Sequence, residues 1–325
     1  MKAIVCTKFG EPATLELREV EGRSPGRGEV RISVRAAGVN FADLLMVGGK
    51  YQVKPDLPFI PGLEVAGEIV ECGEDVGEMR VGDRVLHWAR HGGGFAEEIV
   101  ADAAKVVRLA DEMDFATAAG FHIGHGTAYF ALTRRAALRP GETLLVNGAG
   151  GGVGLAAVEV GKALGARVIA CASTPEKLAA AAERGADLLI DYTAESVRDR
   201  AKAFTDGAGV DVVFDPVGGQ AFGQALRAIG WHGRMLLIGF ACGTVQQIPA
   251  NIVLVKNVSV IGVVWGAESE RDPAFAVEVM GELMEFCRSG AIGPTKCVSH
   301  PLERAADVFA AMAERRNVGK AVLVP

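Results

Sequence analysis

The first third of the chain consists of short apolar or alternating segments separated by glycine and proline, a pattern typical of β-strands. Many short strands with few helices favour a barrel or a rolled sheet, so we expect a β-rich domain here. The expected strands are Ala3–Cys6, Leu15–Val20, Glu29–Ala37, one within Pro58–Val70, Val81–Leu86 and Phe95–Val100.

The hydrophobic pattern changes near Ala116, where strand-like segments begin to alternate with helix-like ones. A repeating β-α-β order predicts a parallel, doubly wound sheet with right-handed crossovers. After Trp265 we expect two amphipathic helices and a closing strand that packs on the first domain. The expected strands are Thr143–Asn147, Arg167–Ala172, Leu188–Asp191, Val210–Asp215, Met235–Gly239 and Lys320–Val324, and the clearest helices are Val153–Leu164 and Pro175–Arg184.

Composition narrows the class of protein. A chain of 325 residues, half of them hydrophobic, is long enough for two domains with sizeable cores. A formal net charge of -6 argues against a nucleic-acid surface. No secretory signal and no apolar run of about 18 residues is evident, so we expect a cytoplasmic protein that does not enter membranes. The six cysteines form no CxxC pair and are expected to be buried thiols.

A glycine cluster, Asn147–Gly154 (NGAGGGVG), directly follows an expected strand and opens an expected helix. Within it Ala149, Gly151 and Gly154 form an AxGxxG pattern. Small residues at this spacing permit a tight turn, let the backbone approach a pyrophosphate and let helix and strand pack closely. The pyrophosphate then lies at the helix N-terminus. The placement between strand and helix predicts a dinucleotide site.

The end of the second strand of this domain indicates which dinucleotide is bound. NAD-binding domains usually carry an acidic residue there, which holds the ribose 2′-hydroxyl. Here the strand ends Ala172-Ser173 without an acid, Lys177 follows, and Tyr192 comes after the third strand. A hydroxyl, an ammonium and a phenol together can bind a 2′-phosphate. The sequence therefore predicts NADPH, with a solvated surface lysine as the alternative interpretation of Lys177.

These features together resemble one family: a β-rich first domain, AxGxxG, then STPEK, IDY and a GKAVLVP ending. The chain is similar to the zinc-free branch of the medium-chain dehydrogenase/reductase superfamily, the NADPH:quinone oxidoreductases related to zeta-crystallin. The resemblance implies an α/β fold with a GroES-like catalytic domain, residues 1–123 and 266–325, and a Rossmann NADPH-binding domain, residues 124–265. It also implies homodimers or homotetramers joined through the Rossmann sheets.

The resemblance further implies a role for individual residues. Asn40 and Thr127 would lie near the nicotinamide ribose, and Gly239 and Phe240 would flank the nicotinamide half. The residues that would hold the phosphates are Gly151, Gly152 and Val153 at the pyrophosphate, and Ser173, Lys177, Tyr192 and Arg315 at the 2′-phosphate.

Zinc enzymes of this superfamily use a cysteine after the third strand and a histidine in a Gly-His-Glu motif. The corresponding residues here are Asn40 and Leu63, which are not plausible zinc ligands. His87 and His91 stand four residues apart in what the glycines Gly92–Gly94 indicate is a loop. A histidine pair lacks further donors, so we expect no metal site.

Without zinc, another group must stabilise the negative charge that hydride transfer leaves on an acceptor oxygen. Tyr51 follows a flexible GGK segment near Asn40 and is the first candidate for the proton donor, with a pocket-lining aromatic as the alternative interpretation. Asn40 could orient the substrate or the ribose. Asp43 and His122 are weaker candidates for the donor.

Three functions fit this sequence. The first is an NADPH-dependent reductase of quinones or α,β-unsaturated carbonyls. The second is a reductase of enoyl thioesters of the acryloyl-CoA type, whose CoA would favour basic residues such as Arg134 and Arg135. The third is a non-catalytic NADPH-binding protein. The fold alone cannot decide among them, because function depends on the site.

Overall fold

The computed structural model describes residues 1–293, 297–314 and 316–325. The chain divides into two compact units. The first consists of Met1–Ile123, Gly266–Arg288 and Gly293–Pro325, and the second of Gly124–Trp265 and Ser289–Ile292. None of the helices in the described part of the chain has the length and apolar character needed to cross a membrane.

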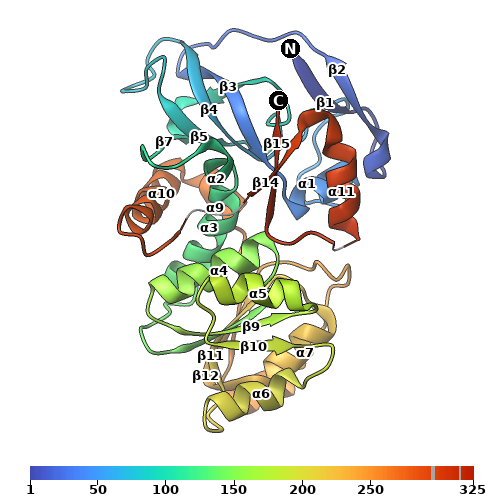
Figure 1. Ribbon diagram of the computed structural model, residues 1–325, viewed down its shortest axis with the longest axis vertical. Coiled ribbons are helices and arrows are strands. Elements are labelled where there is room, and N and C mark those ends of the chain that lie inside the picture. Colours follow the sequence, from blue (N-terminus) through green and yellow to red (C-terminus); the bar gives the residue numbers. More distant parts are fainter. Residues whose placement is uncertain (294–296, 315) are drawn as a thin grey trace. The chain divides into compact units, whose positions relative to one another are not determined.

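The first unit is built on a seven-stranded sheet in the order β14-β15-β3-β4-β5-β7, with β6 also paired to β3 (Figure 1). A separate antiparallel pair joins β1 and β2. The strands are β1 (Lys2–Cys6), β2 (Leu15–Glu19), β3 (Glu29–Gly38), β4 (Glu64–Cys72), β5 (Arg84–Trp88), β6 (Glu98–Asp102), β7 (Val106–Arg108), β14 (Cys297–Pro301) and β15 (Lys320–Val324).

The helices of the first unit come from both ends of its discontinuous sequence. Val30, Ile32 and Val34 alternate with more exposed residues along β3, so one face of that strand enters the core. The ring of Phe309 on α11 packs there against Phe95, with 5.9 Å between ring centroids. The helices are α1 (Phe41–Val47), α2 (Phe115–Ala119), α3 (Phe121–Tyr129), α9 (Trp265–Arg271), α10 (Pro273–Arg288) and α11 (Ala305–Ala313), of which α3 continues into the second unit.

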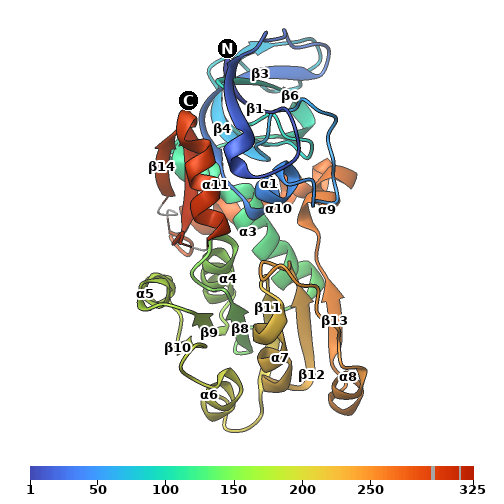
Figure 2. The same ribbon diagram turned by 90° about the vertical axis from the view of Figure 1, so that its right-hand side faces the viewer.

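The second unit contains a six-stranded sheet in the order β10-β9-β8-β11-β12-β13, with every pair parallel (Figure 2). Each residue of the central strand β8 is buried, as expected of a strand covered on both faces. The strands are β8 (Thr143–Asn147), β9 (Arg167–Ala172), β10 (Leu188–Asp191), β11 (Val210–Asp215), β12 (Ile229–Leu237) and β13 (Ser259–Gly262).

Helices connect the parallel strands of this unit. α4 packs against α5, and α6 packs against α7. The order of the strands reverses at β8, whose neighbours are β9 and β11, and ligands of doubly wound sheets bind at such a switch point. The helices are α4 (Gly152–Ala163), α5 (Pro175–Glu183), α6 (Val197–Phe204), α7 (Gly219–Ala228) and α8 (Ala250–Lys256), with a π-helical turn at Phe130–Arg135.

The predicted α/β class, a β-rich sheet with a parallel doubly wound sheet, is confirmed. Some element bounds were wrong. β12 begins at Ile229 rather than Met235, because a register shift against β11 carries the chain through His232 at a φ of 59°. A bulge rich in glycine and polar residues does not show the alternation that identifies a strand. β7, β13 and β14 were not predicted.

Candidate functional site

The glycine turn after β8 has the geometry of a phosphate-binding loop. Gly148 has a φ of 61°, a conformation that residues with side chains rarely adopt. Gly151 is the N-cap of α4 and has no side chain that could accept hydrogen bonds from the first turn of the helix. The N–H groups of Gly152 and Val153, which cannot bond within the helix, are therefore available to an anion.

Two glycines of this turn lie so close to neighbouring atoms that a side chain would not fit. A Cβ atom on Gly154 would lie 2.2 Å from the carbonyl oxygen of Gly148, so only glycine allows α4 to pack this close to the turn. A Cβ atom on Gly150 would lie 2.4 Å from the Cβ atom of Lys177. The turn thus fits a dinucleotide pyrophosphate, and Lys177 lies directly against it.

A buried hydrogen-bond network joins the ends of β8 and β11. Asn147 Nδ2 donates to Asp215 Oδ1 over 3.1 Å, and the backbone N–H groups of Val217 and Gly218 donate to the same carboxylate. Burial raises the pKa of Asp215, while the bonds from Gly218 and Asn147 lower it. This network holds the two loops at the switch point together, although neither Asn147 nor Asp215 was singled out from the sequence.

The residues proposed for the 2′-phosphate follow neighbouring strands. Ala172 and Asp191 are paired at the ends of β9 and β10. Ser173 and Tyr192, which follow them, therefore lie at the same edge of the sheet. The N–H of Tyr192 donates to the carbonyl oxygen of Ala172 over 3.2 Å. Of the three proposed residues, Lys177 lies against Gly150 of the glycine turn, while Ser173 and Tyr192 directly follow β9 and β10.

The remaining cofactor residues of the second unit lie on other elements. Thr127 is buried on α3, and Gly239 and Phe240 follow β12. A Cβ atom on Gly239 would lie 3.3 Å from the carbonyl oxygen of Pro216 in the loop after β11. Arg315 lies outside the described residues.

The first unit contains a buried cluster of polar side chains around Lys320, the first residue of β15. Lys320 Nζ donates to Asn40 Oδ1 over 2.6 Å and to Glu64 Oε1 over 2.5 Å. The residue Lys320 is 5% exposed, and Glu64 is 1% exposed. Glu64 Oε2 accepts from the N–H of Ile123 over 2.8 Å. We call Asn40, Asp43, Glu64 and Lys320 the buried cluster.

Both polar atoms of the Asn40 side-chain amide are hydrogen-bonded within the protein. Besides accepting from Lys320, the amide donates from Nδ2 to Glu64 Oε1 over 3.0 Å and to the carbonyl oxygen of Gly38 over 3.3 Å. The orientation of the amide is therefore fixed within the protein. Sequence reasoning missed Glu64 and Lys320 as site residues, although Glu64 follows Leu63 in the zinc-type motif and Lys320 belongs to the GKAVLVP ending.

Asp43 is the member of the buried cluster that lies on α1, and Tyr51 follows that helix in the chain. Asp43 is 0% exposed on α1, and its Oδ2 accepts from the N–H of Asn40 over 2.8 Å. Burial raises the pKa of Asp43 to about 7, although the Asn40 bond and Lys320 lower it. Tyr51 packs beside the apolar residues Met46 and Phe59, and burial together with the nearby Asp43 carboxylate raises the pKa of its phenol.

Two histidines of the first unit are buried as neutral rings. His87 lies within β5 rather than in the predicted loop, because the strand continues to Trp88 before the glycines begin. Burial lowers the pKa of His87 to about 4 and that of His122 to about 3. His122 stacks on Trp88 with 4.3 Å between centroids. No three His, Cys, Asp or Glu side chains gather as a metal site within the described residues.

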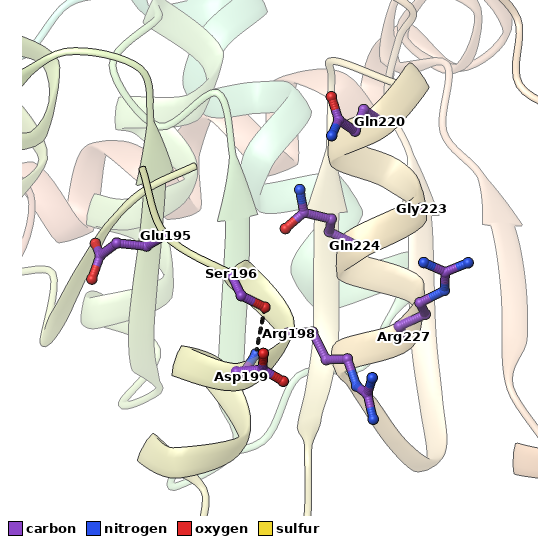
Figure 3. Close-up of a pocket in the computed structure, with 8 residues that line it drawn as sticks. All are labelled: Glu195, Ser196, Arg198, Asp199, Gln220, Gly223, Gln224 and Arg227. Carbon is purple, nitrogen blue, oxygen red and sulfur yellow. Dashed lines mark hydrogen bonds between the residues drawn. The ribbon is translucent and has the colours of Figure 1, made fainter. Parts of the chain in front are cut away.

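A hollow of about 480 Å³ opens between α6 and α7 in the second unit (Figure 3). Ser196 Oγ accepts there from the N–H of Asp199 over 3.3 Å, and Gln224 Oε1 accepts from Val197 over 3.1 Å. Acidic and basic side chains share its rim, which gives it no preference for either sign of charge. None of the residues of the glycine turn line it, so it is separate from the candidate nucleotide site.

Two domain families match the chain. Residues 26–111 match the alcohol dehydrogenase GroES-like domain, and residues 152–280 match the family described as zinc-binding dehydrogenase. The first match lies in the β-rich unit, and the second begins at the N-terminus of α4.

Relatives match along nearly the whole chain. The quinone oxidoreductase-like protein 2 homolog of Nematostella vectensis is 41% identical over 99% of this chain and 88% of its own. The quinone oxidoreductase of Pseudomonas aeruginosa is 34% identical over 100% of this chain and 99% of its own. The crystal structure of Escherichia coli quinone oxidoreductase complexed with NADPH has a TM-score of 0.91 and 29% identity, and the match covers 100% of both chains.

Proposed function

Because the chain belongs to the quinone oxidoreductase family of the medium-chain dehydrogenases/reductases, we propose that it is an NADPH-dependent, zinc-independent reductase of quinones or α,β-unsaturated carbonyls. The observation that carries the proposal is that Lys177 lies against the glycine turn, with Ser173 and Tyr192 directly after the neighbouring strands β9 and β10 and no acid at the end of β9. These side chains provide two hydroxyl groups and a cation where NAD-binding domains usually provide an acid. A 2′-phosphate is the group that such a set binds.

The residues of the second unit bind and orient the cofactor, which when bound supplies a hydride. The backbone N–H groups of Gly152 and Val153 would hold the pyrophosphate at the positive end of α4, and Gly151, whose own N–H donates to the carbonyl oxygen of Gly148 over 3.1 Å, would let the pyrophosphate approach because it has no side chain. Thr127, Gly239 and Phe240 would lie beside the nicotinamide half of the cofactor.

The residues of the first unit act on the acceptor. Tyr51 donates a proton to the acceptor oxygen, where negative charge develops during hydride transfer. Lys320 and Glu64 hold the amide of Asn40 in one orientation, in which it would lie beside the ribose or the substrate. Zinc independence rests on Asn40 and Leu63, which occupy the positions of the zinc ligands and cannot replace them.

The cofactor preference can be tested by replacing Lys177 with alanine. We expect NADPH affinity to fall about 10- to 100-fold, because a charge-assisted bond to the phosphate is lost, while NADH affinity changes by less than about twofold. Cofactor fluorescence titrations measure both. Lys202→Ala on α6 is the control and should leave both affinities unchanged. Equal losses for NADPH and NADH would contradict the assignment.

The acceptor class can be tested by following NADPH oxidation with a simple quinone and with crotonyl-CoA at equal concentrations. We expect the quinone to be reduced faster than crotonyl-CoA, and NADPH to be oxidised faster than NADH. Preferred turnover of crotonyl-CoA would establish an enoyl-thioester reductase instead. Tight NADPH binding with no turnover of any carbonyl compound would establish a binding protein.

We also propose that two copies pair through the β13 edge of the six-stranded sheet. β13 ends the strand order of the sheet (Figure 2). Apolar side chains in the segments just before and after it are exposed: Leu254 is 76%, Val255 66% and Val264 57% exposed. An uncovered edge strand flanked by apolar side chains pairs readily with a second copy.

Lysine at both Leu254 and Val264 should therefore convert dimers to monomers in analytical ultracentrifugation, because charge would be buried in the interface. Val81→Lys, at a residue 64% exposed in the first unit, is the control and should leave the mass unchanged. A double variant with the wild-type mass would rule out this interface.

A further inference from the structure

Three loops of the second unit leave the same edge of its sheet. β8, β11 and β12 are neighbouring parallel strands, so their carboxyl ends lie side by side (Figure 2). The glycine turn follows β8. We call residues 216–218 after β11 the β11 loop, and residues 238–242 after β12 the β12 loop. The glycine turn is proposed for the pyrophosphate, and Gly239 and Phe240 of the β12 loop are proposed for the nicotinamide half. β11, whose loop has no part in the proposed function, is the strand between the other two.

The side chain of Asp215, the buried last residue of β11, holds the β11 loop beside the glycine turn. Its Oδ1 accepts from Asn147 Nδ2, at the end of β8, over 3.1 Å. The same oxygen accepts from the N–H groups of Val217 and Gly218 over 3.1 and 3.2 Å, which folds the loop back onto its own strand. The Val217 side chain lies against the glycine turn, because a Cβ atom on Gly148 would come within 2.7 Å of Val217 Cγ2.

The backbone of the β11 loop in turn holds the β12 loop. The N–H of Ala241 donates to the carbonyl oxygen of Pro216 over 3.1 Å. The N–H of Cys242 donates to the carbonyl oxygen of Val217 over 2.9 Å. Gly239 lies at the same contact, because a Cβ atom on it would lie 3.3 Å from the Pro216 oxygen. A movement of the β11 loop is therefore passed on to the β12 loop.

We propose that Asp215 is a positioning residue for NADPH, an inference that rests on the proposed function. By holding the β11 loop, it sets the spacing between the pyrophosphate site at the glycine turn and the nicotinamide site at the β12 loop. Two linked halves of a ligand reinforce each other's binding only when the spacing of their sites matches the ligand. Every group bonded to the Asp215 side chain is a hydrogen-bond donor, so this position requires an acceptor.

The test is Asp215→Ala, which leaves the three donors without their acceptor and frees the β11 loop from the end of β8. Isothermal titration calorimetry compares NADPH with adenosine 2′,5′-bisphosphate, which carries the 2′-phosphate but lacks the nicotinamide half. We expect the affinity for NADPH to fall about 10-fold and that for the bisphosphate to change less than about twofold, because only NADPH needs both sites at the correct spacing.

Two variants of the same network separate positioning from loss of folding. Asp215→Asn keeps an oxygen that can accept from all three donors, and should restore the affinity for NADPH to within about twofold of the wild type. Asn147→Ala removes only the bond from β8, and it serves as the test where loss of the whole carboxylate unfolds the protein. It should weaken NADPH binding about threefold without affecting the bisphosphate.

Asp211→Ala is the matched control. Asp211 joins the same two strands near their opposite ends, where its Oδ2 accepts from the N–H of Thr143, the first residue of β8, over 2.7 Å. This variant also removes a bond between β8 and β11, but far from the three loops, so it should leave both affinities unchanged. Losses as large as those of Asp215→Ala would mean that loosening of the sheet explains the effect, and would overturn the proposal.

The remaining outcomes of the titrations are equally decisive. Equal losses for NADPH and the bisphosphate would mean that the variants damage the glycine turn itself, and would overturn the positioning role. Wild-type affinity for NADPH in both Asp215→Ala and Asn147→Ala would overturn it as well. Calorimetry requires no turnover, so a wild type that binds NADPH but reduces no acceptor would overturn the proposed function alone, and the comparison of the two ligands would still decide the role of Asp215.

Discussion

Replacing Lys320 by methionine should destabilise the first unit by about 3–5 kcal/mol, because removing one partner of a buried ion pair leaves the other charge uncompensated. Methionine fills a similar volume, so packing changes little. Glu64 would keep its bonds from Asn40 and Ile123 but lose its cation. Urea unfolding followed by circular dichroism measures the loss.

Two further variants separate charge from packing in this experiment. Adding Glu64→Gln to Lys320→Met should restore part of the stability, because the uncompensated charge is removed. Lys162→Met removes a lysine whose pairing with Asp187 is about one third exposed, and should cost no more than about 1 kcal/mol. A Lys320→Met protein as stable as the Lys162→Met protein would mean that the buried pair contributes little.

Gly154→Ala should weaken NADPH binding by at least about 100-fold and lower the melting temperature, because the new Cβ would overlap the turn that it supports. That atom would lie 2.2 Å from the Gly148 oxygen and 2.9 Å from the Ala149 Cα, and backbone cannot rotate away as a side chain can. α4 must then move away from β8. Cofactor titration and thermal unfolding measure the two effects.

The control for this prediction is Gly223→Ala on α7, where an added Cβ meets no atom within 4 Å. It should leave cofactor binding unchanged and stabilise the protein by up to about 1 kcal/mol, as alanine does within helices. If both variants bound NADPH like the wild type, close packing at Gly154 would not be a requirement of the turn.

Local sequence patterns predicted the parallel sheet well. The strands Thr143–Asn147, Arg167–Ala172 and Val210–Asp215 have the predicted bounds because each is an apolar run that ends at glycine, serine or proline. β12 was mispredicted where a bulge interrupts its pattern, and β14 has a mostly exposed sequence that carries little signal. Periodicity reports burial, so strands with weak burial escape it.

In the candidate site, too, features built from consecutive residues could be predicted and those built from distant residues could not. The glycine turn could be predicted because its residues are consecutive and have a fixed spacing relative to a strand and a helix. The buried cluster could not, because its bonds join residues as far apart as Asn40 and Lys320, which are separated by 280 positions. Only the pairing of β15 with β3 brings that lysine near the start of α1.

The pairing of β15 with β3 determines when the first unit can complete its sheet during synthesis. β15 pairs with β3 and carries Lys320, yet the ribosome releases it only after the whole of Gly124–Trp265. The second unit can complete its sheet during synthesis, because all six of its strands precede Gly266. Until the last strand emerges, Glu64 lacks its cation and the C-terminal end of β3, at Ala37 and Gly38, is unpaired along one edge. The nascent first unit is therefore the form most exposed to aggregation and to chaperone binding.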